Sequence, residues 1–256
     1  MKLHLLIPGI LLVLLAACSP PPNLRDTNMW QDESLITGEP CAAPCWQGIT
    51  PGETLWRDAR PIVEDLPGVK DLQIQEQEGQ IGAIWRTNGS DQYCCAIVSN
   101  SGEAVDESDV VSYIQIRLAP NITLGELIEA QGAPAYVVNG EEVSEEQAYI
   151  VLLYPDIPVI AYTFVAGAAN GALSSSSEIV FVVYLTPEAM QNEVIRNSSL
   201  QAWEGYQSFS YYAEGEANPF ELTPEATAEG TVEASDDATA DADATSEATQ
   251  EATPSS

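Results

Sequence analysis

Basic side chains and histidine are scarce in this sequence. Its 256 residues contain eight Lys and Arg against 39 Asp and Glu, a formal net charge of −31 at pH 7. Binding to nucleic-acid phosphates needs clustered basic side chains, so this balance argues against a nucleic-acid partner. The single histidine, His4, lies in an N-terminal segment that we expect to be cleaved. The mature chain would then lack the imidazole of Ser-His and Cys-His catalytic sites and of His-ligated metal sites.

The short motifs of several large enzyme classes are also missing. The sequence has no G-x-S-x-G nucleophile motif, no P-loop and no dinucleotide-binding fingerprint. Acidic residues do cluster, as at Asp106, Glu107 and Asp109, but chance produces such neighbours in so acidic a chain. We therefore predict a non-enzymatic protein with no catalytic residue, no cofactor and no metal. An enzyme that uses only carboxylates, for instance on glycans, is the remaining enzymatic alternative.

Residues 1–17 have the features of a sorting signal. Lys2 is followed by an apolar run over residues 5–15, which is shorter than the roughly 20 residues that span a bilayer. The run ends in Leu-Ala-Ala-Cys at Cys18, which resembles the lipobox of bacterial lipoproteins. The resemblance implies that Cys18 is diacylated, becomes the first residue of the mature chain and anchors it to a membrane of the cell envelope. An ordinary secretory signal with small residues at its cleavage site is the alternative.

Two segments are predicted to be disordered. Residues 18–40 are polar and begin with three prolines near the anchor, which is typical of a tether. Residues 222–256 consist almost wholly of Ala, Thr, Glu, Asp and Ser and contain no aromatic or basic residue. Such a composition cannot bury enough apolar surface to offset the entropy of ordering, so we predict an acidic disordered tail. Trp30, within the tether, is a candidate exposed aromatic.

The acidic character extends beyond the tail. The tail holds nine of the 39 acids, and Lys2 precedes the predicted cleavage point, which leaves 30 acids and seven basic residues, a net charge near −23, over residues 18–221. A surface of this kind favours a cationic partner, or serves solubility and repulsion from anionic polymers of the envelope.

A weak internal repeat divides the central part of the chain. Ile-Thr-Pro-Gly-Glu at residues 49–53 returns as Ile-Thr-Leu-Gly-Glu at residues 122–126. Both copies contain the T-x-x-E pattern of a helix capping box. We predict one unit over residues 41–120 and a second over residues 121–221. The first helix would start at Thr50, with Pro61 kinking it, and the second would end at Gly132.

Four strand-like runs follow each predicted helix. They lie near residues 69–75, 80–87, 92–99 and 109–118, then 134–139, 147–154, 158–165 and 178–185. Asn88-Gly89 and Asn139-Gly140 are typical turn sequences, and residues 166–177 form a long Gly, Ala and Ser loop. We therefore predict an α+β fold, in which two consecutive units of one helix and four antiparallel strands pack as one domain between disordered flanks.

Parts of the sequence resemble three known families. Residues 122–137, ITLGELIEAQGAPAYV, resemble the helix-to-strand entry of small outer-membrane lipoproteins of the SmpA/OmlA type. The tandem unit is similar to the β-lactamase-inhibitor-protein-like fold. Residues 44–52 read Pro-Cys-Trp-Gln-Gly-Ile-Thr-Pro-Gly and resemble an uncharacterised lipoprotein domain with a Pro-Cys-Trp-x-Gly-Ile-x-Pro-Gly motif. The duplication, the acidity and the tail depart from the assembly lipoproteins.

Four cysteines remain besides Cys18, namely Cys41, Cys45, Cys94 and Cys95. An even number in an exported chain favours disulfides. Neighbouring strand residues point to opposite faces, so Cys94 and Cys95 are not expected to pair with each other. We predict at least one bridge from the loop of Cys41 and Cys45 to the strand of Cys94 and Cys95. A local Cys41–Cys45 bridge and a four-thiolate zinc site are the alternatives.

A segment after the last strand is rich in aromatic residues. Leu200, Trp203, Tyr206 and Phe209 recur every third position. We predict that the segment folds back onto the second unit; the alternative is an exposed strip at Trp203, Tyr206 and Phe209 for a protein partner or a glycan.

Together these observations predict a lipid-anchored, non-enzymatic module of a bacterial envelope, with its domain outside the cytoplasm. It would bind the membrane through its N-terminal lipid and act in protein interaction or envelope structure. An extracytoplasmic ligand-binding or inhibitor domain is the alternative, and it requires a concave sheet face with exposed aromatics.

Overall fold

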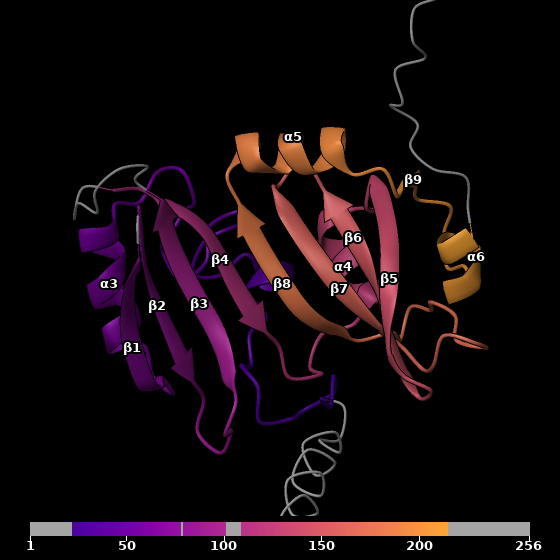
Figure 1. Ribbon diagram of the computed structural model, residues 1–256, viewed down its shortest axis with the longest axis horizontal. Coiled ribbons are helices and arrows are strands. Elements are labelled where there is room, and N and C mark those ends of the chain that lie inside the picture. Colours follow the sequence, from indigo (N-terminus) through magenta and orange to yellow (C-terminus); the bar gives the residue numbers. More distant parts are fainter. Residues whose placement is uncertain (1–21, 78, 101–108, 215–256) are drawn as a thin grey trace, which may run out of the picture. The chain divides into compact units, whose positions relative to one another are not determined.

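The computed structural model describes residues 22–77, 79–100 and 109–214. Within them the chain forms one antiparallel sheet of nine strands in the order β1-β2-β3-β4-β8-β7-β6-β5-β9 (Figure 1). The strands are β1 (Lys70–Gln77), β2 (Gln80–Arg86), β3 (Tyr93–Asn100), β4 (Val111–Arg117), β5 (Tyr136–Ser144), β6 (Gln147–Tyr154), β7 (Val159–Val165), β8 (Ile179–Leu185) and β9 (Leu200–Ala202).

The helices of the described residues are short. They are α2 (Ser34–Thr37), α3 (Trp56–Asp65), α4 (Leu124–Gln131), α5 (Pro187–Arg196) and α6 (Phe209–Glu214). None of these described helices has both the length and the apolar character needed to cross a bilayer.

The predicted fold class of two units, each with one helix and four strands, is wrong. Strands β1 to β8 lie within a few residues of the eight predicted runs, but β4 and β8 pair directly, from Tyr113 opposite Leu185 to Arg117 opposite Phe181. This pairing joins two four-stranded meanders into a single sheet. The alternation of apolar and polar residues predicts where a strand lies and which way its side chains point. It does not predict which strands pair with each other. Joining β4 to β8 satisfies backbone groups that two separate sheets would leave unpaired.

The second predicted capping box is confirmed and the first is wrong. The Thr123 side chain accepts from the Glu126 amide, and the Glu126 carboxylate accepts from the Thr123 amide, at the start of α4. Helix α3 instead begins at Trp56, six residues after Thr50, and its N-cap residue makes no side-chain hydrogen bond. Gly52, at φ +85°, cannot continue a helix, and its amide donates to Val111 of β4. Residues 50–53 therefore form a turn against the sheet.

Two further helix and turn predictions are corrected. Pro61 lies inside α3 without dividing it. Asn139-Gly140 lies within β5, at a shift of register against β6, and is not a hairpin turn. A Cβ atom at Gly140 would lie 1.4 Å from the Tyr149 carbonyl oxygen, so glycine is required there by a close approach of two strands. The turn at Asn88-Gly89 is confirmed.

The predicted disorder of residues 18–40 is wrong for residues 22–40. The Trp30 amide donates to the Arg117 carbonyl at 3.1 Å, and the Ala119 amide donates to the Trp30 carbonyl at 2.8 Å. Met29, Trp30 and Leu35 are buried in the main core. The average polarity of the segment is high, but these few apolar side chains suffice to fix it to the sheet.

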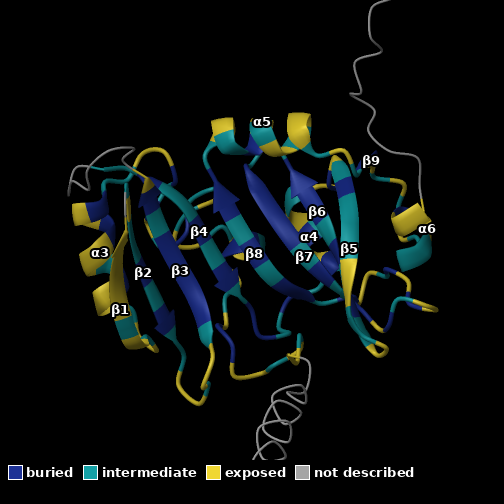
Figure 2. Ribbon diagram, in the orientation of Figure 1, coloured by how far each residue is buried: buried dark blue, intermediate teal, exposed yellow. Residues whose placement is uncertain are grey.

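The two faces of the sheet are covered differently (Figure 2). One face carries the main core, to which α2, α3, α4 and α6 contribute Leu35, Trp56, Val63, Leu127 and Tyr212. We call this the core face. On the opposite face, the open face, α5 covers one end through Met190, which packs with Leu153, Ile160 and Leu185. Tyr113, Tyr162 and Phe181, also on this face, stay half-buried.

Candidate functional site

Several predicted features lie outside the described residues. They are the signal over residues 1–17, the lipidation site Cys18 and the acidic tail over residues 222–256. Of the acidic cluster after β3, Asp106 and Glu107 also lie outside them.

The four remaining cysteines form two local disulfides, Cys41–Cys45 and Cys94–Cys95. The predicted bridge between loop and strand is therefore wrong, and the local Cys41–Cys45 alternative is found. The pairing of adjacent strand residues has a backbone cause. Trp85 lies opposite Cys95 and Arg86 lies opposite Tyr93, so Cys94 is the extra residue of a β-bulge. A bulge breaks the alternation of side chains, and both cysteines belong to the same core cluster.

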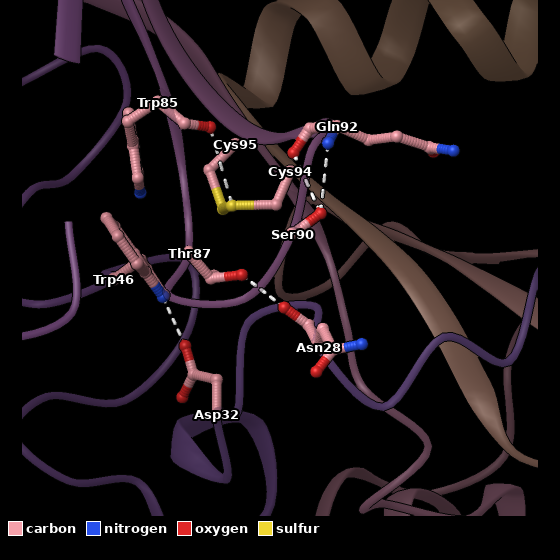
Figure 3. The surroundings of a disulfide bond; sticks show 9 residues. All are labelled: Asn28, Asp32, Trp46, Trp85, Thr87, Ser90, Gln92, Cys94 and Cys95. Carbon is pink, nitrogen blue, oxygen red and sulfur yellow. Dashed lines mark hydrogen bonds between the residues drawn. A yellow bond between two sulfur atoms is a disulfide. The ribbon is translucent and has the colours of Figure 1, made fainter. Parts of the chain in front are cut away.

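The Cys94–Cys95 pair is enclosed by the protein (Figure 3). Each cysteine is only 3% exposed, and the Cys94 sulfur lies 3.6 Å from the Trp85 carbonyl oxygen. The rings of Trp46 and Trp85 stack nearby at 6.0 Å between centroids, and Trp30 meets both edge-on. This burial assigns the disulfide to the core and not to an accessible reactive site.

The Pro-Cys-Trp-x-Gly-Ile motif also serves the core. Trp46 and Ile49 exchange two backbone hydrogen bonds of 2.8 and 2.9 Å, with Gln47 and Gly48 at positive φ between them. This two-residue turn needs the left-handed conformation at both central positions, which favours glycine. It directs Trp46 and Ile49 into the interior, where both are fully buried. The Trp46 indole N–H donates to Asp32 (Figure 3).

The aromatic segment near the C-terminal end folds back, as predicted for it. Its strand β9 pairs with β5, Leu200 is buried, and Trp203 stacks on the buried Tyr212 with 6.2 Å between ring centroids. Trp203 and Phe209 pack partly against the core. Tyr206 is 45% exposed, so it is the most exposed of the three candidate interaction residues.

The open face carries a groove that was not predicted from the sequence. We define the sheet groove as the cavity of about 550 Å³ over β4, β8, β7, β6 and β5. Its floor is aromatic, because Tyr162 contacts Phe181 at 4.9 Å and Tyr149 at 5.3 Å between ring centroids. Charged side chains lie at its two ends, Arg117 on β4 and Glu141 on β5. A concave, largely apolar surface with a few polar groups is typical of a binding site.

Some polar groups of the groove already make hydrogen bonds within the protein. Arg117 donates to the Gln92 side chain at 2.7 Å, and burial lowers its pKa while the charge of Asp26 acts to raise it. The Tyr149 hydroxyl donates to Glu141 at 2.7 Å. Burial, followed by Glu141, raises the pKa of Tyr149, and burial raises the pKa of Tyr162. Both phenols therefore stay protonated and able to donate at neutral pH.

The start of the described chain forms one wall of the groove. Pro22 and Leu24 line it, and the Leu24 amide donates to Gln147 of β6 at 2.8 Å. Arg25 pairs with Glu178 at 2.5 Å and lies over the Phe164 ring, 5.2 Å from its centroid. These contacts hold the N-terminal segment at the end of the sheet opposite α5.

The sequence does indicate the residues of this face, because they occupy every second position of their strands. In β4, Tyr113, Gln115 and Arg117 alternate with the buried Ile114 and Ile116. Strands β6 to β8 are apolar on both faces, which indicates a second surface that needs cover or a ligand. The pairing of β4 with β8, which brings Arg117 beside Phe181, could not be predicted from these patterns.

Among the described residues, no group of three or more His, Cys, Asp or Glu side chains is arranged to hold a metal ion. No protein-family model, curated protein or solved structure matches the chain.

Proposed function

We propose that this chain is a bacterial lipoprotein, anchored by lipid on Cys18 to a membrane of the cell envelope. Its folded part would be a non-enzymatic binding module outside the cytoplasm. The Leu-Ala-Ala-Cys sequence at Cys18 supports the anchor. The pairing of all four other cysteines in disulfides supports an oxidising compartment, since such bonds persist mainly in exported proteins.

The observation that carries the binding role is the sheet groove. Three aromatic rings, Tyr149, Tyr162 and Phe181, form a half-buried floor, and Tyr162 also packs against the cluster that contains Met190 of α5. Aromatic faces contribute large contact areas at low entropic cost, and the flanking Arg117 and Glu141 can orient a bound group. The site therefore supports recognition of a ligand or of a segment of a partner.

The anchor is tested by the processing of the precursor. Globomycin blocks the signal peptidase of lipoproteins, so treated cells should accumulate unprocessed chain, and the untreated mature chain should begin with a Cys18 carrying the mass of attached lipid. Normal processing under globomycin, with an unmodified N-terminal residue, would refute the anchor.

The groove is tested by polar substitutions on its floor. We expect the double variant Tyr162→Ser and Phe181→Ser to lose co-purifying envelope components that the wild-type chain retains after crosslinking. Ile195→Ser is the matched control, because Ile195 lies on α5 and is 60% exposed. Thermal unfolding of each variant separates lost binding from lost folding, and unchanged capture by the folded double variant would contradict the proposal.

A second candidate function is protein docking at the aromatic segment. The observation favouring it is that Tyr206 and Tyr211 are 45% and 43% exposed, with Tyr206 against the Trp203 ring. An alanine series at Trp203, Tyr206 and Phe209 tests it. Loss of a partner by Tyr206→Ala at unchanged melting temperature would favour docking, whereas lowered melting temperatures at Trp203 and Phe209 alone would leave the segment a structural cap.

A further inference from the structure

The sheet groove lies close to the predicted anchor. Pro22 and Leu24 line the groove, and only residues 19–21 separate Pro22 from Cys18. Four residue steps reach at most about 14 Å even when fully extended. Because residues 22–40 are part of the fold, they cannot lengthen this connection. A lipid on Cys18, as in the proposed function on which this inference rests, would hold the groove next to the headgroup layer of the same membrane.

The charges of the groove are separated in a way that suits a zwitterion. Arg117 on β4 and Glu141 on β5 both line it, and four strand spacings, about 19 Å at the backbone, lie between them. The Glu141 carboxylate, which accepts from Tyr149 of β6, shortens that gap from one end. The Arg117 guanidinium bonds to Gln92 on the β3 side and would turn toward β8 to meet a ligand. A guanidinium is well suited to a phosphate, because its N–H groups form a planar fork. Carboxylates next to aromatic rings suit an ammonium group.

The charges of the groove and of the whole chain disfavour headgroups that carry only a negative or only a positive charge. An anionic headgroup would meet Glu141 and the acidic surface of the whole chain, and a simple cation would meet Arg117. We propose that the sheet groove binds the phosphoethanolamine headgroup of a lipid of the membrane that holds Cys18. Its phosphate would accept from Arg117, its ammonium would donate to Glu141, and the two-carbon linker between them would lie on the aromatic floor.

The test separates headgroup binding from anchoring. Residues 18–256 with Cys18→Ser contain every described residue and carry no lipid. We expect this chain to float with vesicles of phosphatidylethanolamine and phosphatidylcholine, and to bind less to phosphatidylcholine alone, whose quaternary ammonium offers no N–H donor. Binding to vesicles of phosphatidylglycerol and phosphatidylcholine should be weakest. Glycerophosphoethanolamine should compete.

Substitutions identify the groove as the site. Arg117→Gln, and separately Glu141→Gln, should each weaken the phosphatidylethanolamine-dependent binding about tenfold, the scale of one charged hydrogen bond. Glutamine keeps the acceptor for the Tyr149 hydroxyl. Glu129→Gln is the control, because Glu129 is exposed on α4, a helix of the core face. Melting temperatures verify that each variant folds.

Two results would overturn the inference. They are equal binding of the Cys18→Ser chain to all three kinds of vesicle, and wild-type binding by the folded groove variants. If the headgroup preference holds but the native chain carries no lipid, the anchoring proposal fails alone. If the chain is lipidated and the groove captures a partner but shows no headgroup preference, this inference fails alone.

Discussion

At the scale of single residues, burial distinguishes the two disulfides. Cys94 and Cys95 are each 3% exposed, whereas Cys41 and Cys45 are half-buried in a loop. A reductant must reach a sulfur atom to open the bond, so access controls the order of reduction in the folded state.

We therefore expect gentle reduction of the native protein to open Cys41–Cys45 first. Stepwise reduction, alkylation and peptide mass analysis measure the order, and unfolding with denaturant should abolish the difference. Earlier labelling of Cys94 and Cys95, or peptides linked from Cys41 to Cys94, would contradict the structure.

A second prediction at this scale concerns pH. Hydrogen bonds from Thr123, first from its side chain and then from its backbone, lower the pKa of Glu126 below its ordinary value in the folded state. A lowered folded-state pKa stabilises the protein above the unfolded pKa, and this contribution is lost as the pH falls through the folded value.

Glu126→Gln keeps an acceptor for the Thr123 amide but does not titrate. The stability of the wild type relative to this variant should thus be constant above about pH 6 and decline below about pH 4.5. Chemical denaturation across this range tests it. A difference that stays constant down to pH 3 would show that the capping bond does not shift the pKa.

At the scale of elements, the N-terminal segment behaves as part of the sheet and not as a tether. Trp30 is 8% exposed and contacts the rings of Trp46 and Trp85 at 6.0 and 6.3 Å. Removing a buried tryptophan leaves a cavity, which typically costs about 3–5 kcal/mol.

Trp30→Ala should lower the free energy of unfolding by about 3–5 kcal/mol. Ile195→Ala, at a 60% exposed position, should change it by no more than about 0.5 kcal/mol. Urea denaturation of both variants gives the comparison. A Trp30→Ala variant as stable as the wild type would mean that residues 22–40 are a tether after all.

The helices and strands also show which parts of the fold can be predicted from the sequence. Alternating apolar residues locate β1 to β8, and Thr123 with Glu126 marks the start of α4, because these signals are local. The pairing of β4 with β8 depends on contacts between distant segments, and the bulge at Cys94 depends on the exact register of β3 against β2. The same limit applies to the sheet groove, whose residues come from five strands and the N-terminal segment. Local periodicity identifies such residues singly, and only the strand order brings them together.

At the scale of the whole molecule, we propose that the sheet separates structural and binding roles between its faces. The four buried tryptophans and the Cys94–Cys95 disulfide all belong to the core face. The open face keeps a half-buried aromatic floor between Arg117 and Glu141. The central claim is that this groove is where the protein meets its partner or ligand.

Site-specific photocrosslinking in the native envelope tests that claim most directly. A photoreactive phenylalanine analogue would replace Phe181 in the groove, and in a second chain Ile195 on α5. We expect a discrete adduct, whether lipid, small molecule or protein, from position 181 and none from position 195. No adduct from position 181 in a folded, correctly processed chain, or the same adduct from both positions, would contradict the account.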